Sequence, residues 1–147
     1  MLVREILRRK PNQIISFIGA DDPVLDAVRF MNDNRIGSLL ARNEAGDVVG
    51  IVTERDILRA VAKDLDGLKE KKVADLMTKD LICGLADDDS NYVMLIMTRN
   101  KIRHLPVVHE GKIIGLISIG DLISCQLEET QVQKRTLHDL LELSGKL

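Results

Sequence analysis

The chain has 147 residues, a formal net charge of −2 and 45% apolar residues, a composition that fits one compact globular domain. The mixed charges form no basic face for a nucleic acid, and aromatic residues, on which bases stack, make up only 2%. No apolar run approaches the roughly eighteen residues that a membrane span requires, and the first residues lack the apolar stretch of a signal peptide. We therefore expect a cytoplasmic protein that neither inserts into a membrane nor binds nucleic acid.

The first half of the chain predicts the order helix, strand, helix, strand, strand, helix, from apolar residues at helical spacing and short apolar runs. The acidic pair Asp21 and Asp22 is expected to cap the second helix, and Pro23 suits its first turn. The expected elements are a helix over 2–7, a strand over 14–18, a helix over 24–34, strands over 36–41 and 48–52, and a helix around 57–61.

The second half predicts the same order, followed by a tail without a counterpart. The expected elements are a helix over 73–77, a strand over 81–85, a helix over 90–99, strands over 105–108 and 112–117, and a helix opened by Asp121. The corresponding domains are a first repeat over 1–66, a linker over 67–72, a second repeat over 73–126 and a helical tail over 127–147. The modest leucine stripe of the tail predicts packing on its own domain or on a second subunit, with docking to another protein as the alternative.

An internal repeat underlies this parallel order. Residues 50–56 read glycine, two branched apolar residues, a hydroxyl residue, two variable positions and an aspartate, and residues 115–121 repeat that pattern. Two copies of one unit indicate a pseudo-twofold module of mixed α/β (α+β) class, in which each repeat has a small three-stranded sheet flanked by helices. A unit of about 65 residues that folds alone buries only about 60% of the surface that its unfolded chain exposes, so the halves are expected to share one core.

The repeated motif has two interpretations. Thr53 and Asp56, like Ser118 and Asp121, have the spacing of a capping box, which accounts for the hydroxyl and the acid without a ligand. Alternatively, the motif is a ligand site. A hydroxyl and free N–H groups at a strand-to-helix junction can bind a phosphate, and a carboxylate one turn later can accept from ribose hydroxyls. The cap alone leaves the glycine of each copy unexplained.

These paired segments, each preceded by a branched apolar strand and by a helix bearing Met31 or Met97, resemble a tandem of cystathionine-β-synthase (CBS) domains, together called a Bateman module. The resemblance covers residues 1 to about 126 and implies that an adenosine-type ligand binds in the two clefts between the repeats. In the first cleft it assigns the ribose to Asp121, the phosphate to Ser118, and a second phosphate contact to Arg103. The remaining residues expected to line this cleft are Leu116, Asp22, Ala27, Ile36 and Gly37.

The second cleft is related to the first by the pseudo-symmetry. The resemblance assigns its ribose to Asp56 and its phosphate to Thr53, and the opposite wall to Asp88, Val93 and the backbone of Ile102 and Arg103. Gly37 stands at its phosphate end where the first cleft has Arg103, so the first cleft is expected to bind phosphorylated ligands more tightly. AMP, ADP, ATP, NAD and S-adenosylmethionine are the candidate effectors, and the acids Asp22 and Asp88 count against a triphosphate.

The resemblance implies a regulatory module that senses its ligand by a change of conformation or dimer geometry and acts on a protein partner. A homodimer is expected, with Leu58, Val61 and Ile123 at its surface. No catalytic or metal-binding spacing is present, so no enzymatic activity is expected. The alternatives are an adaptor that docks a partner through its helices, and a small Mg²⁺-dependent hydrolase built on the acidic cluster 87–89. Cys83 and Cys125 are expected to be buried, reduced thiols.

Overall fold

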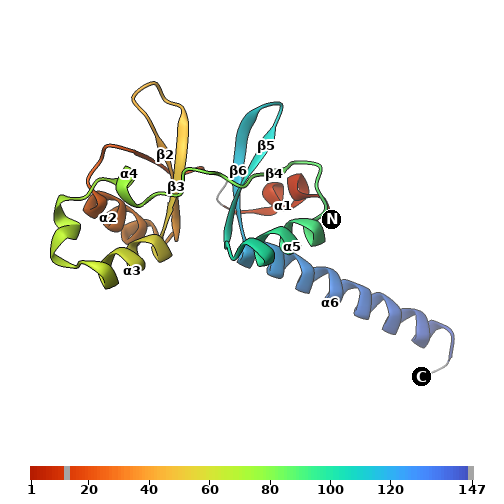
Figure 1. The fold of residues 1–147 in the computed structure, drawn as a ribbon. Helices are drawn as coiled ribbons and strands as arrows, with labels where there is room; N and C mark the ends of the chain where they lie inside the picture. The colour runs from red at the N-terminus through yellow and green to blue at the C-terminus, as the bar shows by residue number, and fades with distance from the viewer. Residues whose placement is uncertain (12–13, 146–147) are drawn as a thin grey trace. The chain divides into compact units, whose positions relative to one another are not determined.

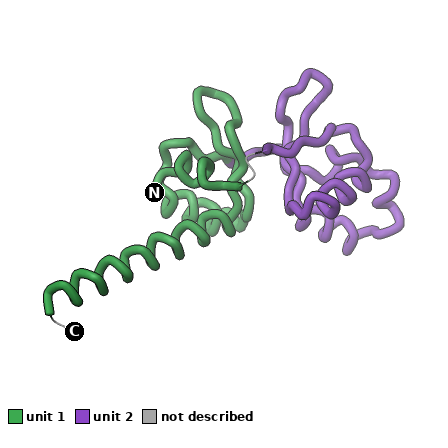
Figure 2. Tube along the Cα trace, turned by 180° about the vertical axis from the view of Figure 1, so that it is seen from behind, with its two compact units in different colours: residues 1–13, 83–147 green, residues 14–82 purple. Residues whose placement is uncertain are grey.

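A computed structural model describes residues 1–11 and 14–145 and divides the chain into two compact units. Unit 1 is formed by residues 1–13 together with 83–147, and unit 2 by residues 14–82 (Figure 2). Each unit contains one three-stranded sheet and its own helices (Figure 1). The expected mixed fold of two similar three-stranded repeats is confirmed.

Unit 2 is built on the sheet β1-β2-β3, in which β1 runs parallel to β2 and β2 antiparallel to β3. The hairpin turns where predicted, because the Asn43 side chain accepts from the Asp47 N–H at 2.9 Å and Gly46 adopts a φ of 87°. Its core contains Leu39 and Val52 of the sheet and Ala27 and Met31 of a covering helix. The elements are β1 Phe17–Gly19, α2 Val24–Asn34, β2 Ser38–Arg42, β3 Val48–Thr53, α3 Glu54–Lys63, the 3-10 helix η1 Asp66–Glu70 and α4 Val73–Leu76.

Unit 1 repeats this arrangement with the sheet β4-β5-β6. The sheet residues Leu105, Val107 and Ile117 are fully buried and pack with Val93 and Met97 of α5. The elements are α1 Val3–Arg9, β4 Gly84–Leu85, α5 Ser90–Asn100, β5 His104–His109, β6 Lys112–Ser118 and α6 Ile119–Leu143.

The N-terminal helix α1 belongs to the unit formed by the second half of the chain. Val3 and Ile6 are buried in the core of unit 1, and Val3 N–H donates to the carbonyl of Asp88 at 3.0 Å. In unit 2 the short helix α4 takes the equivalent place, because Val73 is buried and its N–H donates to the carbonyl of Asp22 at 2.9 Å. Each unit is therefore completed by a helix that precedes the other repeat in the sequence.

Each unit has an apolar cluster of its own among the described residues. Other buried apolar side chains, among them Leu40 and Ile51, belong to neither cluster, and the expectation of one shared core stays a prediction. The size argument treated residues 1–66 and 73–126 as the folding halves, whereas each unit gains a helix from outside its half. Val3 and Ile6 supply that apolar surface in unit 1, and Val73 supplies it in unit 2.

The same helices explain the glycine that opens each copy of the motif. A Cβ at Gly115 would lie 2.8 Å from Cδ2 of Leu7, on α1, and a Cβ at Gly50 would lie 2.6 Å from Sδ of Met77, which follows α4. Both distances are far shorter than a van der Waals contact. The two glycines therefore leave space for the helix that completes each unit, an explanation that requires no ligand.

We predict that Gly115→Ala lowers the free energy of unfolding of unit 1 by about 1–3 kcal/mol, because the added methyl overpacks the contact with Leu7. Gly120→Ala is the matched control, since the nearest atom to its Cβ is the Ser118 Oγ at an ordinary 3.6 Å and alanine favours helix. Urea denaturation of both variants tests this. A Gly115→Ala variant as stable as the wild type would contradict the packing explanation.

Several local predictions need correction. The helix α2 has Pro23 as its N-cap without a side-chain cap bond, because the Asp22 carboxylate instead accepts from the Gly19 N–H at 2.9 Å. The expected strand over 14–18 pairs only at Phe17–Gly19, and the strand over 81–85 only at Gly84–Leu85. The linker contains η1, whose Leu68 is buried. Neither thiol is buried, since Cys83 is exposed and Cys125 half-buried.

The predicted tail continues the closing helix without a break, so that α6 spans 25 residues (Figure 1). Leu122, near its beginning, is buried in the core of unit 1. The last two residues of the expected tail, 146 and 147, lie outside the described residues. No helix in the described part of the chain is long and apolar enough to cross a membrane.

Candidate functional site

In unit 2 the motif forms a strand-to-helix junction between β3 and α3. Thr53 is the N-cap, and its Oγ1 accepts from the Asp56 N–H at 3.4 Å. The Asp56 carboxylate accepts in return from the Thr53 N–H at 2.8 Å and from the Thr53 hydroxyl at 3.0 Å. Arg59, one turn further along α3, lies 3.7 Å from the same carboxylate. The capping box is therefore formed in this copy, and it engages the threonine hydroxyl itself.

The second copy forms the same junction between β6 and α6 in unit 1. Ser118 Oγ accepts from the Asp121 N–H at 3.1 Å, and Asp121 Oδ2 accepts from the Ser118 N–H at 2.8 Å. The first N–H of α6, that of Ile119, donates to the carbonyl of Arg103 at 2.9 Å. The bonds of Ile119 and Asp121 use two of the first three N–H groups of α6, and the third belongs to Gly120.

A cation that the motif did not predict completes the junction of unit 1. Lys10, just after α1, places its Nζ 3.0 Å from Asp121 Oδ2 and donates to the carbonyl of Leu116 at 3.0 Å. Lys10 and Asp121 are 111 positions apart, and only the packing of α1 on this unit brings them together. No local pattern in the sequence indicates the contact.

The environment of Asp121 lowers the pKa of its carboxyl. Burial alone raises this pKa, but the hydrogen bond from the Ser118 N–H and the Lys10 ammonium outweigh burial. A carboxyl whose pKa is lowered by folding stabilises the fold at pH values above its unfolded pKa, and this contribution disappears as the pH falls through the folded-state pKa. The junction of unit 1 is therefore held in its charged form at neutral pH.

We predict that Lys10→Met raises the pKa of Asp121, so that acid destabilisation of unit 1 begins at a higher pH than in the wild type. Lys10→Arg, which keeps the positive charge, is the control and should leave the titration close to the wild type. The carboxyl carbon of Asp121 can be titrated by NMR alongside unfolding curves at each pH. Equal titrations in Lys10→Met and the wild type would show that Lys10 does not act on this carboxyl.

The remaining predicted site residues are divided between the units. Ile36 and Gly37 lie before β2 in unit 2, where the Gly37 carbonyl accepts from the Glu54 N–H at 3.0 Å. In unit 1, Ile102 is half-buried and the side chain of Arg103 is exposed. The backbone at 37 and 103 therefore meets the beginning of α3 and α6, within each unit. The assembly of residues from both units into one ligand site stays a prediction.

Four expected wall residues have structural roles in their own units. Ala27 and Val93 are buried in the two cores, with 0% and 1% of their surface exposed, which explains an apolar residue there without a ligand. Asp22 accepts from the Gly19 N–H, and Asp88 accepts from the Leu85 N–H at 2.7 Å.

The acidic cluster 87–89 was considered above as the basis of a Mg²⁺-dependent hydrolase. Its carboxylates contact cationic groups and backbone N–H groups of the protein itself. Asp87 lies 3.0 Å from Arg4, and Asp89 caps α5 by accepting from the Asn91 N–H at 2.9 Å. The N-terminal ammonium lies 3.4 Å from Asp89. Among the residues that the structure describes, no group of three or more His, Cys, Asp or Glu side chains is placed to hold a metal ion.

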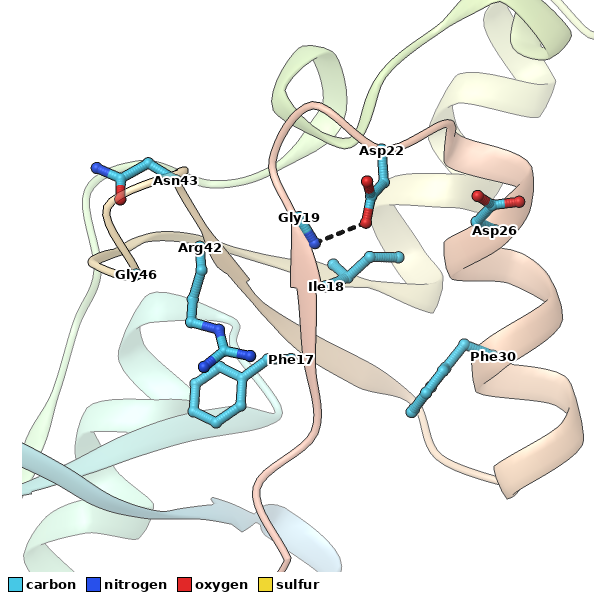
Figure 3. Close-up of a pocket in the computed structure, with 9 residues that line it drawn as sticks. All are labelled: Phe17, Ile18, Gly19, Asp22, Asp26, Phe30, Arg42, Asn43 and Gly46. Atoms are coloured by element: carbon cyan, nitrogen blue, oxygen red, sulfur yellow. Dashed lines mark hydrogen bonds between the residues drawn. The ribbon is translucent and has the colours of Figure 1, made fainter.

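Unit 2 also contains an open hollow of about 470 Å³ beside β1 (Figure 3). Both phenylalanines of the chain, Phe17 and Phe30, line it, and the Arg42 guanidinium lies 4.0 Å from the centre of the Phe17 ring. Two carboxylates, Asp22 and Asp26, lie on its wall. Because two acids oppose one arginine, the hollow does not favour a polyanion, and Asp22 is its only predicted site residue.

The fold and the two junctions agree with the family that the chain matches. A model of the CBS domain matches residues 3–63 and 73–128, and the chain therefore belongs to the CBS domain family, of which it carries two copies. The resemblance stated above is confirmed. Pairs of CBS domains are regulatory modules, and many bind adenosine-containing ligands.

Individual relatives support the same assignment. The mitochondrial CBS domain-containing protein CBSX3 of Arabidopsis thaliana is 34% identical over 83% of this chain, which spans 61% of that protein's length. A putative signal-transduction protein with CBS domains from Burkholderia ambifaria is 37% identical, with a TM-score of 0.82 over 87% of this chain and 95% of its own. The CBS domain pair of protein MJ0100, in complex with 5′-methylthioadenosine and S-adenosylmethionine, has a TM-score of 0.74 over 88% of this chain and 98% of its own. At 24% identity, this last likeness shows the fold alone.

Proposed function

We propose that the protein is a non-enzymatic regulatory module that binds an adenosine-containing nucleotide or metabolite and signals by a change of conformation or of dimer geometry. The observation that carries the proposal is the junction at the start of α6, where the Asp121 carboxylate accepts from the Ser118 N–H and pairs with the Lys10 ammonium, beside the Ser118 hydroxyl. This junction combines acceptors for a ribose with donors for a phosphate.

The hydrogen bonds at this junction leave room for both roles. One oxygen of Asp121, Oδ2, accepts from Ser118 and Lys10, so Oδ1 is the oxygen available to accept from a ribose hydroxyl. A phosphate at the helix N-terminus would accept from the Gly120 N–H, and the positive end of the helix dipole favours it. The Lys10 ammonium, which pairs with Asp121 and donates to the Leu116 carbonyl, would place a positive charge near that phosphate.

The two junctions differ in charge, which supports unequal affinity for phosphorylated ligands. The Asp121 junction has Lys10 beside its carboxylate, with 29% of the Lys10 side chain exposed, and belongs to the site for which Arg103 is predicted. The Asp56 junction has Arg59 at 3.7 Å, whose side chain is 74% exposed and directed along its own helix. A less exposed cation is screened less by water. We propose that the Asp121 site is the tighter one.

The structure and the relatives define a panel of ligands. The protein MJ0100 pair contains 5′-methylthioadenosine and S-adenosylmethionine, which lack phosphate, and these join AMP, ADP, ATP and NAD as candidates. A thermal-shift assay with each compound, and with GTP as the control for the base, tests the proposal. A ligand that binds only the folded protein, at a hundredfold excess over its dissociation constant, raises the free energy of unfolding by about 2.7 kcal/mol.

A shift with one adenosine compound and none with GTP supports the proposal and identifies the effector. Equal shifts with adenosine and guanosine compounds would contradict base recognition. No shift with any compound at millimolar concentration would reject the sensor proposal in favour of an adaptor. The long exposed segment of α6 favours that adaptor as the second candidate, with its C-terminal helix as the docking surface. In either case we propose a cytoplasmic homodimer with a regulated protein partner.

A further inference from the structure

The C-terminal part of α6 lacks a partner in the described structure. Leu122 packs in the core of unit 1, but from 126 to 145 every residue is exposed except Leu141, which is half-buried. Figure 1 shows this segment extending beyond the rest of unit 1. A helix without tertiary packing is only marginally stable in water, so a segment of this length gains most of its stability from a partner.

One face of the segment carries the pattern of a two-stranded coiled coil. Its positions are spaced alternately by four and three residues, as in the a and d positions of a heptad repeat. Ile123, Leu127 and Leu137 are 47%, 59% and 58% exposed, so the apolar members are accessible along the helix. We call this face the α6 seam, and its residues are Ile123, Leu127, Thr130, Lys134, Leu137 and Leu141.

The order of residues along the α6 seam makes it complementary to itself in one orientation. When two copies run antiparallel, Ile123 lies opposite Leu141, Leu127 opposite Leu137, and Thr130 opposite Lys134 of the second copy. Apolar residues then face apolar residues at both ends, and polar residues face each other at the centre. A polar central layer of this kind fixes the register of a coiled coil.

Other arrangements of the same seam are less favourable. A parallel pair in register places Lys134 opposite Lys134, which brings two like charges together in the interface. Moving one antiparallel helix by a heptad places Lys134 opposite either Leu137 or Ile123, which buries a charge against an apolar side chain. Only the antiparallel register with Thr130 opposite Lys134 avoids both costs.

The positions that flank the α6 seam carry no acid. With Leu127, Lys134 and Leu141 at a positions, the flanking e and g positions are Ser124, Gln126, Gln131, Gln133, His138 and Leu140. The acids of this segment lie on the helix face away from the seam, so antiparallel pairing brings no two carboxylates together at its edges.

We propose that the α6 seam binds the α6 seam of a second copy of this chain, antiparallel, with Thr130 opposite Lys134 at the centre of the interface. This inference is independent of the proposed ligand, and it places the dimer contact on the C-terminal helix. Of the residues expected at the dimer surface from the sequence, only Ile123 belongs to it.

The oligomeric state of the full chain tests the proposal. We expect the wild type to be a dimer by size-exclusion chromatography with light scattering, and the double variant Leu127→Glu, Leu137→Glu to be a monomer. The dissociation constant of the dimer should rise by more than about a hundredfold, since four exposed leucines per dimer lose their apolar partners. Val132→Glu is the matched control, because Val132 is 65% exposed on the opposite side of the same helix.

A wild type that is monomeric at millimolar concentration would overturn the proposal, as would a dimer that survives the double variant. Because both leucines are exposed, the fold of unit 1 should be unchanged, and circular dichroism with thermal unfolding checks this. Loss of the dimer in Val132→Glu as well would show that helix formation, rather than the seam, had been disturbed, and would also count against the proposal.

Disulfide trapping distinguishes the orientations. In a background with both native cysteines replaced by serine, Leu127→Cys and Leu137→Cys are prepared as separate proteins. Under mild oxidation we expect a covalent dimer only after the two are mixed, because position 127 faces 137 of the second copy. A covalent dimer from either variant alone would indicate a parallel or unspecific pair and overturn the assigned register.

Discussion

Deletion of residues 1–9 is expected to unfold unit 1, although these residues belong to the first repeat of the sequence. The deletion removes Val3 and Ile6 from the core of unit 1 and Leu7 from its contact with β6. Each buried aliphatic side chain contributes about 1.5–3 kcal/mol, and a small domain has only about 5–15 kcal/mol in total. Hydrogen exchange should therefore show lost amide protection in β5 and β6, while β2 and β3 of unit 2 remain protected.

A point substitution gives a milder form of this experiment. Ile6→Ala should lower the stability of unit 1 by about 2–5 kcal/mol, because the side chain is 2% exposed. Leu58→Ala is the control, since Leu58 is an exposed residue of α3, and it should have little effect. If Ile6→Ala loosened β2 and β3 and left β5 and β6 protected, the assignment of α1 to unit 1 would be wrong.

Replacement of Asp121 by alanine is expected to affect both stability and ligand binding. The substitution leaves the Ser118 N–H without its acceptor in a half-buried position and removes one of the two acceptors of the Lys10 ammonium, at a cost of about 1–3 kcal/mol. If Asp121 also binds the ribose of the ligand, the affinity should fall by about tenfold to a hundredfold, the range of a hydrogen bond to a charged group. Urea denaturation and calorimetric titration measure the two effects separately.

Asp56→Ala is the matched variant, because it removes the same capping carboxylate from the other junction. It should destabilise unit 2 instead of unit 1 and weaken a phosphorylated ligand less than Asp121→Ala does. Asp121→Asn helps to separate the roles, since the amide oxygen can still accept from the Ser118 N–H while the charge that pairs with Lys10 is lost. Unchanged affinity in Asp121→Ala, with stability lowered as expected, would leave Asp121 only its capping role.

Local features of the chain were predictable from the sequence because neighbouring residues determine them. The turn around Asn43 and Gly46, the helix over 90–99 and the two capping boxes all depend on contacts within a few positions. The repeated motif also indicated which residues of the two halves correspond to each other. The capping box, one of the two interpretations of the motif, is confirmed at both junctions, and the ligand role stays a prediction.

Features that depend on distant contacts were not predictable. Nothing near Lys10 indicates that it meets Asp121, and nothing near Gly115 indicates that Leu7 packs against it. The acids at 21 and 22 were expected to cap a helix, but the Asp22 carboxylate accepts from the Gly19 N–H instead. Apolar runs at 14–18 and 81–85 favour strands along their whole length, yet only the residues that reach β2 or β5 form hydrogen-bonded pairs.

The assignment of α1 to unit 1 has a consequence for synthesis on the ribosome. All residues of unit 2, 14–82, emerge before those of the second sheet, so unit 2 can complete its core while translation continues. The helix α1 is made first, but its partners Leu105 and Ile117 follow about a hundred residues later, a delay of roughly 5–20 seconds at ordinary elongation rates. During that interval the apolar face containing Val3 and Ile6 is not covered by its native partners, so this segment of the nascent chain is exposed to chaperones and to non-native contacts.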